Sequence, residues 1–212
     1  MGFGAVCISS HDGAGAAEAA RLVAERLGFR LIDEDIVARA AVEADVDREV
    51  VADVERRKSL LTRVLEGLGP ASMAGGAMIM LPDQADYARF ASHELRGLIR
   101  SAIEETARDG KVVIVAHAAS LALASREDVL RVLITAPTEA RQRRLAESLD
   151  VDEREAARVL KRSDAGRADY IKRFYGVAEE PTHYDLVIST ERLTPEDAAR
   201  LVVDAVNGAS PS

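Results

Sequence analysis

The first 33 residues of this chain hold two apolar stretches separated by a glycine turn and a helical pattern. Residues 3–9 are short and largely apolar, which is typical of a strand buried on both faces of a parallel sheet. Residues 16–27 repeat apolar positions at helical spacing, and Gly28 supplies a C-terminal stop. Residues 29–32 predict a second strand. Together these segments form a βαβ unit, which commits the chain to a parallel sheet.

Three further strands are predicted at residues 111–116, 129–136 and 184–189. Helical patterns occupy most of the segments between strands: residues 33–44, 46–68, 83–108, 138–148, 152–161 and 194–206. The last helix is expected to be capped by Thr194-Pro195-Glu196. Because strands and helices alternate without internal repeats, the predicted class is α/β, with a mostly parallel five-stranded sheet and helices on both faces.

The charge balance narrows the ligands that the chain can bind. It carries 28 Lys and Arg against 36 Asp and Glu, a net charge of -8. Sequence-independent binding of nucleic acid requires a basic surface, so no nucleic-acid partner is expected. Small-molecule substrates, held in a local basic pocket, are favoured instead.

Neither a metal centre nor a membrane anchor is expected. The one cysteine, Cys7, lies in an apolar run and reads as a buried, inert thiol. No pair or triple of His and carboxylates has metal-ligand spacing. No run approaches the roughly 18 apolar residues of a membrane span, and the N-terminus has no basic leader. The sequence therefore predicts a cytoplasmic protein.

The glycine turn after the first strand is the candidate binding loop. In open α/β sheets ligands bind beyond the carboxyl ends of the strands, where this turn lies. Gly13-Ala14-Gly15 lets backbone amides converge on an anion, and the following helix N-terminus adds partial positive charge. The alternative is a turn that only connects a strand to a helix.

This loop lacks the lysine of the usual phosphate-binding pattern, in which Gly-Lys is followed by Ser or Thr. Ala16 and Ala17 stand at those two positions, and Glu18 follows. The carboxylates of Asp12 and Glu18 are expected to repel a triphosphate. Arg21, about one helical turn further on, is the first basic residue that can assist the loop.

Four segments resemble the cytidylate kinase-like family of nucleoside monophosphate kinases, and they run in order through nearly the whole chain. They read ISSHDGAG at 8–15, LIDEDIV at 31–37, SDAGRADYIKRFYG at 163–176 and PTHYDLVIST at 181–190. The resemblance implies a P-loop NTPase-like three-layer fold in one domain. Residues 33–110 would form a helical acceptor-binding region and residues 150–176 a mobile lid.

The resemblance also implies a reaction and roles for individual residues. Family members transfer a phosphoryl group from ATP to a nucleoside monophosphate, usually CMP or dCMP, with Mg2+. Arg162 and Arg167 match the family's lid arginines, and Arg173 is a further candidate; planar guanidinium groups suit phosphate oxygens. Asp33 and Arg39 match positions that hold the acceptor. The alternatives are a solvated helix face for the arginines and a helix N-cap for Asp33.

The chain departs from the family at a second point. Where cytidylate kinases show Gly-Arg-Asp or Gly-Arg-Gly after the third strand, this chain reads Ala116-His117-Ala118. His117 thus replaces an acceptor-binding arginine, and we assign it to the same pocket. The loop at residues 67–82, rich in glycine and methionine, suits either a substrate lid or a contact between two copies in a homodimer.

Three functions therefore remain open from the sequence. The first is an ATP-dependent nucleoside monophosphate kinase whose donor phosphates lie on the amides of residues 13–17. The second is a degenerate kinase that binds a nucleotide or another anion in a regulatory or assembly role. The third is a kinase-fold protein that binds no nucleotide.

Overall fold

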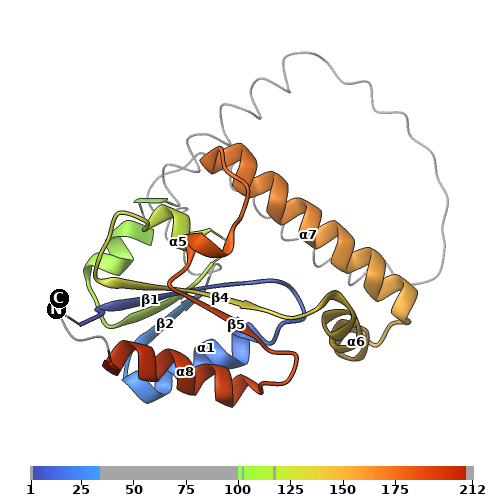
Figure 1. The fold of residues 1–212 in the computed structure, drawn as a ribbon, viewed down its shortest axis with the longest axis horizontal. Coiled ribbons are helices and arrows are strands. Elements are labelled where there is room, and N and C mark those ends of the chain that lie inside the picture. Colours follow the sequence, from blue (N-terminus) through green and yellow to red (C-terminus); the bar gives the residue numbers. More distant parts are fainter. Residues whose placement is uncertain (1, 34–99, 102, 117, 209–212) are drawn as a thin grey trace, which may run out of the picture. The chain divides into compact units, whose positions relative to one another are not determined.

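The computed structural model describes residues 2–33, 100–101, 103–116 and 118–208. Its centre is a sheet of five strands (Figure 1): β1 (Ala5–Ser10), β2 (Arg30–Asp33), β3 (Val112–Val115), β4 (Val129–Thr135) and β5 (Leu186–Ser189). The strand order is β2-β3-β1-β4-β5, and every neighbouring pair is parallel. The predicted α/β class and the five strands are confirmed, and the sheet is parallel throughout.

Strand β1 lies at the centre of the sheet because its residues pair on both sides. Ala5 is level with Val112 of β3 on one side and with Val129 of β4 on the other. Backbone groups of a central strand are satisfied by both neighbours, which explains why β1 can be apolar and buried over most of its length. The segment that follows β1 therefore leaves the sheet at the middle of its carboxyl edge.

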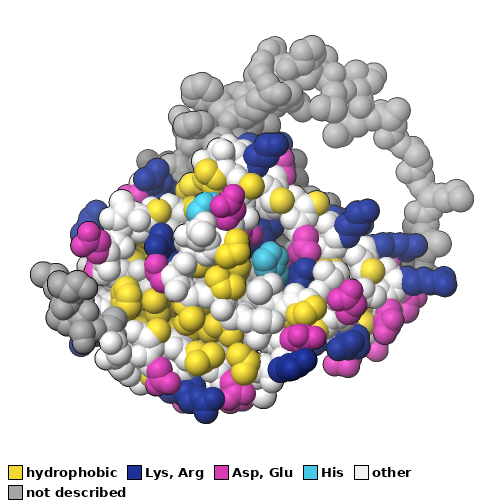
Figure 2. All heavy atoms as spheres, in the orientation of Figure 1, with side chains coloured by type: hydrophobic (Ala, Val, Ile, Leu, Met, Phe, Trp, Pro, Cys, Tyr) yellow, Lys and Arg dark blue, Asp and Glu magenta, His cyan; other side chains and the backbone are white. Residues whose placement is uncertain are grey.

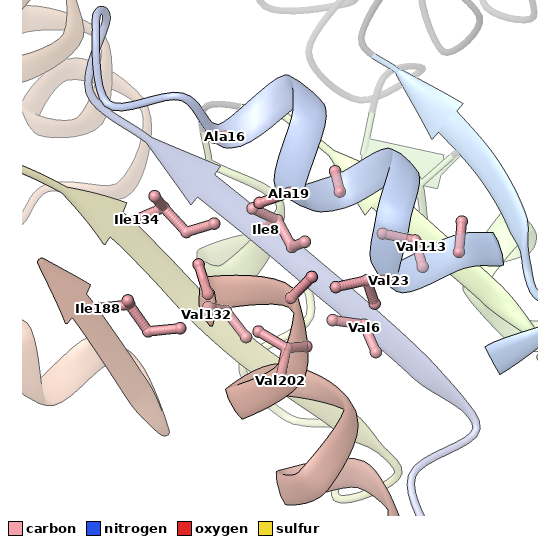
Figure 3. Packing of buried hydrophobic residues seen from close by; sticks show 14 of the residues in the cluster. Val6, Ile8, Ala16, Ala19, Val23, Val113, Val132, Ile134, Ile188 and Val202 are labelled. Atoms are coloured by element: carbon pink, nitrogen blue, oxygen red, sulfur yellow. The ribbon is translucent and has the colours of Figure 1, made fainter. Parts of the chain in front are cut away.

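One face of the sheet is covered by α1 (Ala16–Leu27) and α8 (Pro195–Gly208). Val6 and Ile8 of β1 point towards this face, where Val23 of α1 and Val202 of α8 meet them (Figure 3). All four side chains are fully buried. The short helix α5 (Ala119–Ala122) lies on the opposite face (Figure 1). The layers are thus helix, sheet and helix.

Local signals fix the ends of the two covering helices. Gly28 ends α1 in the left-handed conformation at φ 64, and its amide donates back to the last turn. At the start of α8, Thr194 Oγ1 accepts from the Asp197 amide while Asp197 Oδ2 accepts from the Thr194 amide, both at 3.2 Å. This reciprocal pair is a capping box, so the predicted cap at Thr194 is confirmed.

The second half of the chain adds α6 (Thr138–Leu149), α7 (Glu153–Tyr175) and the 3-10 turn η1 (Pro181–His183). Helix α6 agrees with its prediction, but α7 continues to Tyr175, so the expected end near residue 161 is wrong. The buried positions Ala156, Leu160, Arg167 and Ile171 recur at helical spacing across the glycine at 166. Packing of this face outweighs the roughly 1 kcal/mol that a mid-helix glycine costs.

The other predicted helices lie partly or wholly outside the described residues. Residues 103–108 are helical and end at Gly110 in the left-handed conformation, as expected for the helix predicted over 83–108. The helices predicted over 33–44 and 46–68, and the loop at 67–82, fall outside. Among the helices described, none is both long and apolar enough to cross a bilayer.

Candidate functional site

The loop between β1 and α1 has the geometry of a tight turn that only glycine accepts readily. Gly13 and Gly15 adopt positive φ angles of 76 and 75, in the left-handed region that side chains disfavour. Gly15 is the residue that precedes α1, and no side chain caps the helix there. The helix consequently begins with its first amides uncapped.

These amides form the candidate anion site. Within the part of the chain that the structure describes, the N–H groups of Gly13, Gly15, Ala16 and Ala17 have no hydrogen-bond acceptor. Unpaired amides at a helix N-terminus carry partial positive charge, which favours a bound anion. The predicted phosphate-binding residues 13–17 therefore lie together at the start of α1.

Four carbonyl groups of the same loop are each held by a side chain from a distant part of the chain. Ser10 O accepts from Arg167 Nη1 at 3.0 Å, and Asp12 O accepts from Arg141 Nη1 at 3.3 Å. The other two bonds run to Gly13 O from Arg144 Nη1 at 3.4 Å and to Ala14 O from Thr190 Oγ1 at 2.9 Å. Helices α6 and α7 and the end of β5 thus hold the loop from its carbonyl side.

Helix α6 also approaches the loop too closely for a side chain at Gly13. A Cβ atom added there would lie 2.6 Å from the backbone oxygen of Arg141 and 3.0 Å from its Cα. A Cβ at Gly15 would meet only Pro195 Cγ, at 3.7 Å. Gly13 is therefore required by packing as well as by its backbone angle, whereas Gly15 is required by its angle alone.

A buried guanidinium of α6 joins α7 beside the loop. Arg141 donates to both carboxylate oxygens of Asp164, at 2.9 and 2.8 Å, and to Ala136 O at 3.1 Å. Burial alone would raise the pKa of Asp164, but the hydrogen bonds and charge of Arg141 outweigh it and hold that pKa below its usual range. In the preceding position of α7, Ser163 Oγ donates to Asp12 Oδ2 at 2.5 Å. Asp12 is thereby turned towards α7.

A second ion pair joins the buried Arg167 of α7 to the segment that follows this helix. Arg167 is bonded to both carboxylate oxygens of Glu179, and the Tyr184 hydroxyl also donates to Glu179. Burial raises the pKa of Glu179, but the bonds from Arg167 and Tyr184 more than offset this, so the net pKa is lowered. His11 Nε2 of the loop lies 3.8 Å from Glu179 Oε2.

The surroundings of His11 disfavour its protonated form. Burial lowers its pKa, and the nearby guanidinium groups of Arg167 and Arg141 lower it further, against the opposing charge of Glu179. Its Nδ1 atom is buried and has no hydrogen-bond partner among the described residues. A neutral imidazole beside the loop is consistent with its neighbours already carrying the local positive charge.

The predicted arginines divide into one buried and three exposed side chains. Arg167 is buried and points to the loop backbone, as described above. Arg162 is exposed on α7 and has no partner among the described residues. Arg173 is exposed and lies 3.3 Å from Asp169, and Arg21 pairs with Glu18 and Glu25 on the exposed face of α1. The structure brings only Arg167 into contact with the loop.

The predicted acceptor residues are described only in part. Asp33 ends β2, level with Val115 of β3, at the carboxyl edge of the sheet. Its side chain, like Arg39 and His117 as a whole, lies outside the described residues. Their assignment to an acceptor pocket stays a prediction.

The described residues do not fit a protein-bound magnesium ion. Ala17 supplies no oxygen where Ser or Thr binds magnesium in the usual loop. The nearby carboxylates of Asp12, Asp164 and Glu179 each accept from a side chain of the protein. Across the described ranges, no group of three His, Cys, Asp or Glu residues could hold a metal.

Four residues that shape the site were not singled out from the sequence: Arg141, Arg144, Glu179 and Thr190. One signal was available for three of them. Arg141 and Arg144 lie in the first two turns of a helix that follows a strand, and Thr190 directly follows another strand. Both elements therefore begin or end at the carboxyl edge, where ligands of such sheets bind.

Charges of both signs are mixed over the face of the molecule drawn in Figure 2, and apolar side chains gather between the sheet and α8. On this face the Lys and Arg side chains do not gather into a broad basic surface. This agrees with the excess of acidic residues in the sequence.

Comparisons with known proteins identify the family and the fold. The model of the cytidylate kinase-like family matches residues 5–192. No curated protein matches the chain significantly. Among solved structures, an uncharacterized protein from Eubacterium ventriosum superposes with a TM-score of 0.68 at 15% identity, covering 97% of this chain and 98% of that one.

Two shikimate kinases also superpose, more loosely. The enzyme from Bacteroides thetaiotaomicron has a TM-score of 0.48 at 13% identity, covering 96% of this chain and 98% of that one. The Acinetobacter baumannii enzyme, solved with shikimate, has a TM-score of 0.47 at 14% identity, covering 97% and 94%. At these identities the likeness concerns the fold alone.

Proposed function

Because the chain belongs to the cytidylate kinase-like family, we propose that it transfers a phosphoryl group from ATP to a nucleoside monophosphate at the β1–α1 loop. The observation that carries this proposal is the set of unpaired amides at residues 13, 15, 16 and 17, at an uncapped helix N-terminus. Such a set suits the terminal phosphates of a nucleotide, which need several donors converging on one group.

In this reaction an oxygen of the acceptor's phosphate forms a bond to the γ-phosphorus of ATP. The bond from that phosphorus to the bridging oxygen of ADP breaks at the same centre, so the products are ADP and a nucleoside diphosphate. The acceptor's phosphate is already ionised at neutral pH, so no base has to remove a proton. Catalysis then depends on positioning and on cations around the transferred group.

The cation best suited to that task is Arg162. It is exposed on α7 and its guanidinium has no partner among the described residues, so binding a phosphate would break no existing ion pair. Arg167, the other predicted lid arginine, would first have to leave Glu179. Asp33, Arg39 and His117 remain our proposed acceptor-binding residues. Magnesium, carried in on the ATP phosphates, would neutralise part of their charge.

A second candidate, binding without transfer, is favoured by the pairing of the buried arginines. Arg141 and Arg167 are each neutralised by a carboxylate of the protein, Asp164 and Glu179. The loop also carries Ala16 where lysine usually reaches the outer phosphates. A protein of this kind would hold a nucleotide on its amides and change state without turnover.

Two measurements separate these functions. Calorimetry with ATP and magnesium reports binding, and a coupled assay with each nucleoside monophosphate in turn reports transfer. The kinase proposal predicts both, together with a loss of about 10²-fold in kcat for Arg162→Ala, since one well-placed cation is worth roughly that much. Arg154→Ala, an exposed arginine at the start of α7, is the matched control and should keep full activity.

Binding of ATP without turnover of any monophosphate would instead support the second candidate. Absence of ATP binding would contradict both, and would leave the chain as a kinase-fold protein that uses its loop for another purpose.

A further inference from the structure

Thr190 and Arg144 stand out because they contact the loop from the end of β5 and from α6, and the proposed reaction has not used them. We infer that this pair positions the loop for phosphate, by fixing the peptide planes whose N–H groups would meet the anion. The consequence for affinity rests on the proposed function. The effect on loop order does not.

Thr190 is anchored before it reaches the loop. It directly follows β5, its amide donates to Thr135 O at 2.8 Å, and its side chain is buried. Oγ1 lies 2.9 Å from Ala14 O and 3.2 Å from Thr135 O. The carboxyl ends of β4 and β5 are therefore joined to the loop after β1 through one hydroxyl group.

A hydroxyl group has one proton, so it donates to one of these carbonyls at a time. Arg144 Nη1 donates to Oγ1 at 3.0 Å, which uses an acceptor position of the oxygen and restricts where its proton can point. The shorter of the two remaining contacts is the one to Ala14 O. The arrangement thus favours a directed bond from Thr190 to the loop.

Holding a carbonyl in place also fixes the next amide, because the peptide unit is planar and trans, with C=O and N–H on opposite sides. The bond from Thr190 to Ala14 O therefore orients the Gly15 N–H. In the same way the bond from Arg141 to Asp12 O orients the Gly13 N–H. Both amides lack an acceptor among the described residues. Each held carbonyl group and the unpaired amide that follows it therefore belong to the same peptide unit.

Arg144, which is half-buried, adds charge that the two buried guanidinium groups cannot supply. Arg141 and Arg167 are paired with carboxylates, whereas Arg144 bonds to Gly13 O, Thr190 Oγ1 and Thr190 O and to no carboxylate of the described residues. Its positive charge therefore lies uncompensated against the loop backbone. It partly replaces the charge that a lysine at position 16 would bring, from outside the loop sequence.

The test is a matched pair of substitutions at one position. Thr190→Val keeps the shape of the side chain but removes the hydroxyl, and Thr190→Ser keeps the hydroxyl. Backbone 15N order parameters at Gly13 and Gly15 are measured in the ligand-free protein, and dissociation constants for ATP and for inorganic triphosphate are measured by calorimetry.

We expect order parameters near the rigid value of about 0.85 in the wild type and in Thr190→Ser, and values approaching about 0.6 in Thr190→Val. The dissociation constants should rise about tenfold in Thr190→Val and stay within about twofold in Thr190→Ser. Arg144→Met provides a second variant, should Thr190→Val fail to fold, and should weaken triphosphate binding by a similar factor.

Unchanged order parameters at both glycines in Thr190→Val, or in Arg144→Met, would overturn the positioning role. A loosened loop that still binds ATP and triphosphate as tightly as the wild type would overturn its link to phosphate. If the wild type binds neither ligand, the proposed function fails instead, while the order parameters still decide whether Thr190 holds the loop.

Discussion

The apolar face of the sheet and its carboxyl edge are built from opposite kinds of contact. Under α1 and α8, fully buried side chains such as Val6, Ile8 and Val202 pack without a polar atom among them. At the carboxyl edge, Arg141 and Arg167 are also buried, but hydrogen bonds orient their guanidinium groups. Apolar packing is tolerant of small changes of shape, whereas buried charge is not.

The apolar face and the carboxyl edge therefore have different structural roles. The apolar face holds the layers together and would do so in any α/β domain of this size. The edge holds one loop in one conformation, through contacts from α6, α7 and the end of β5. We therefore expect conservative changes under α1 and α8 to cost little, and changes at the edge to cost more and to act on the loop.

The largest effect is expected at the buried pair of α7. Arg167→Met removes the partner of Glu179 and leaves a carboxylate in a site that is largely shielded from water, which costs about 3–5 kcal/mol of the free energy of unfolding. Ile8→Val, on the apolar face, should cost about 0.5–1.5 kcal/mol. Urea unfolding measures both, and Arg173→Met, which removes only an exposed ion pair, should change stability by less than about 0.5 kcal/mol.

A double variant removes the charges of both Arg167 and Glu179. Arg167→Met combined with Glu179→Gln leaves no buried charge unpaired and should regain part of the stability lost in the single variant. If the double variant is no more stable than Arg167→Met alone, the cost lies in lost packing and not in the unpaired carboxylate.

The next effect compares two glycines within the loop. Gly13→Ala brings a Cβ within 2.6 Å of a backbone oxygen and also strains a positive φ angle, so it should destabilise the protein by about 2–4 kcal/mol. Gly15→Ala meets the φ penalty alone, about 1–2 kcal/mol. Equal costs in thermal or urea unfolding would show that α6 does not press on the loop as described.

Lowering the pH should reduce the stability of the folded protein in two steps. The pKa of His11 is lowered from its ordinary value of 6.5, so below about pH 6.5 the unfolded chain takes up a proton that the folded chain refuses, and stability falls. The lowered pKa values of Glu179 and Asp164 act in the same sense below their ordinary values of 4.5 and 3.8. Both contributions are fully present above neutral pH.

Urea unfolding at a series of pH values measures this profile, and His11→Gln isolates its first step. The variant should lose the decline that begins near pH 6.5 and keep the one that begins near pH 4.5. An unchanged profile would mean that His11 titrates freely and that the edge is open to water at that point.

The smallest effect is expected in the middle of α7. Gly166 lies within the helix, and a Cβ added there meets nothing within 4 Å. Gly166→Ala should therefore raise the free energy of unfolding by about 0.5–1 kcal/mol, because alanine loses less conformational freedom on folding. A loss of stability would show that α7 requires a bend at this residue.

Sequence alone predicted the parts of this fold that depend on neighbours along the chain. The strands, the glycine stop of α1 and the cap of α8 follow from local patterns, and all three are confirmed. The helix predicted over 152–161 was expected to end before Gly166, yet α7 continues through this residue, because the repeating buried positions on either side of it outweigh one glycine.

Only the part of the candidate site that depends on neighbours along the chain could be predicted from the sequence. The amides of residues 13–17 belong to one local turn, and the two glycines in the sequence predict that turn. The side chains that hold the carbonyl groups of this turn come from distant parts of the chain. Arg144 is 131 residues from Gly13, and Thr190 is 176 residues from Ala14. No local pattern links such pairs. Only the strand order, which brings the ends of β1, β4 and β5 together, makes them neighbours.

We propose that the amides at the start of α1, held from behind by side chains of α6, α7 and the β5 end, bind a phosphate group. The test is a titration of 15N-labelled protein with ATP, followed through the amide resonances of residues 13–17. We predict saturable shifts concentrated at Gly13, Gly15, Ala16 and Ala17, which inorganic triphosphate reproduces. Resonances of these four amides that stay unmoved at saturating ATP, while others shift, would contradict the account.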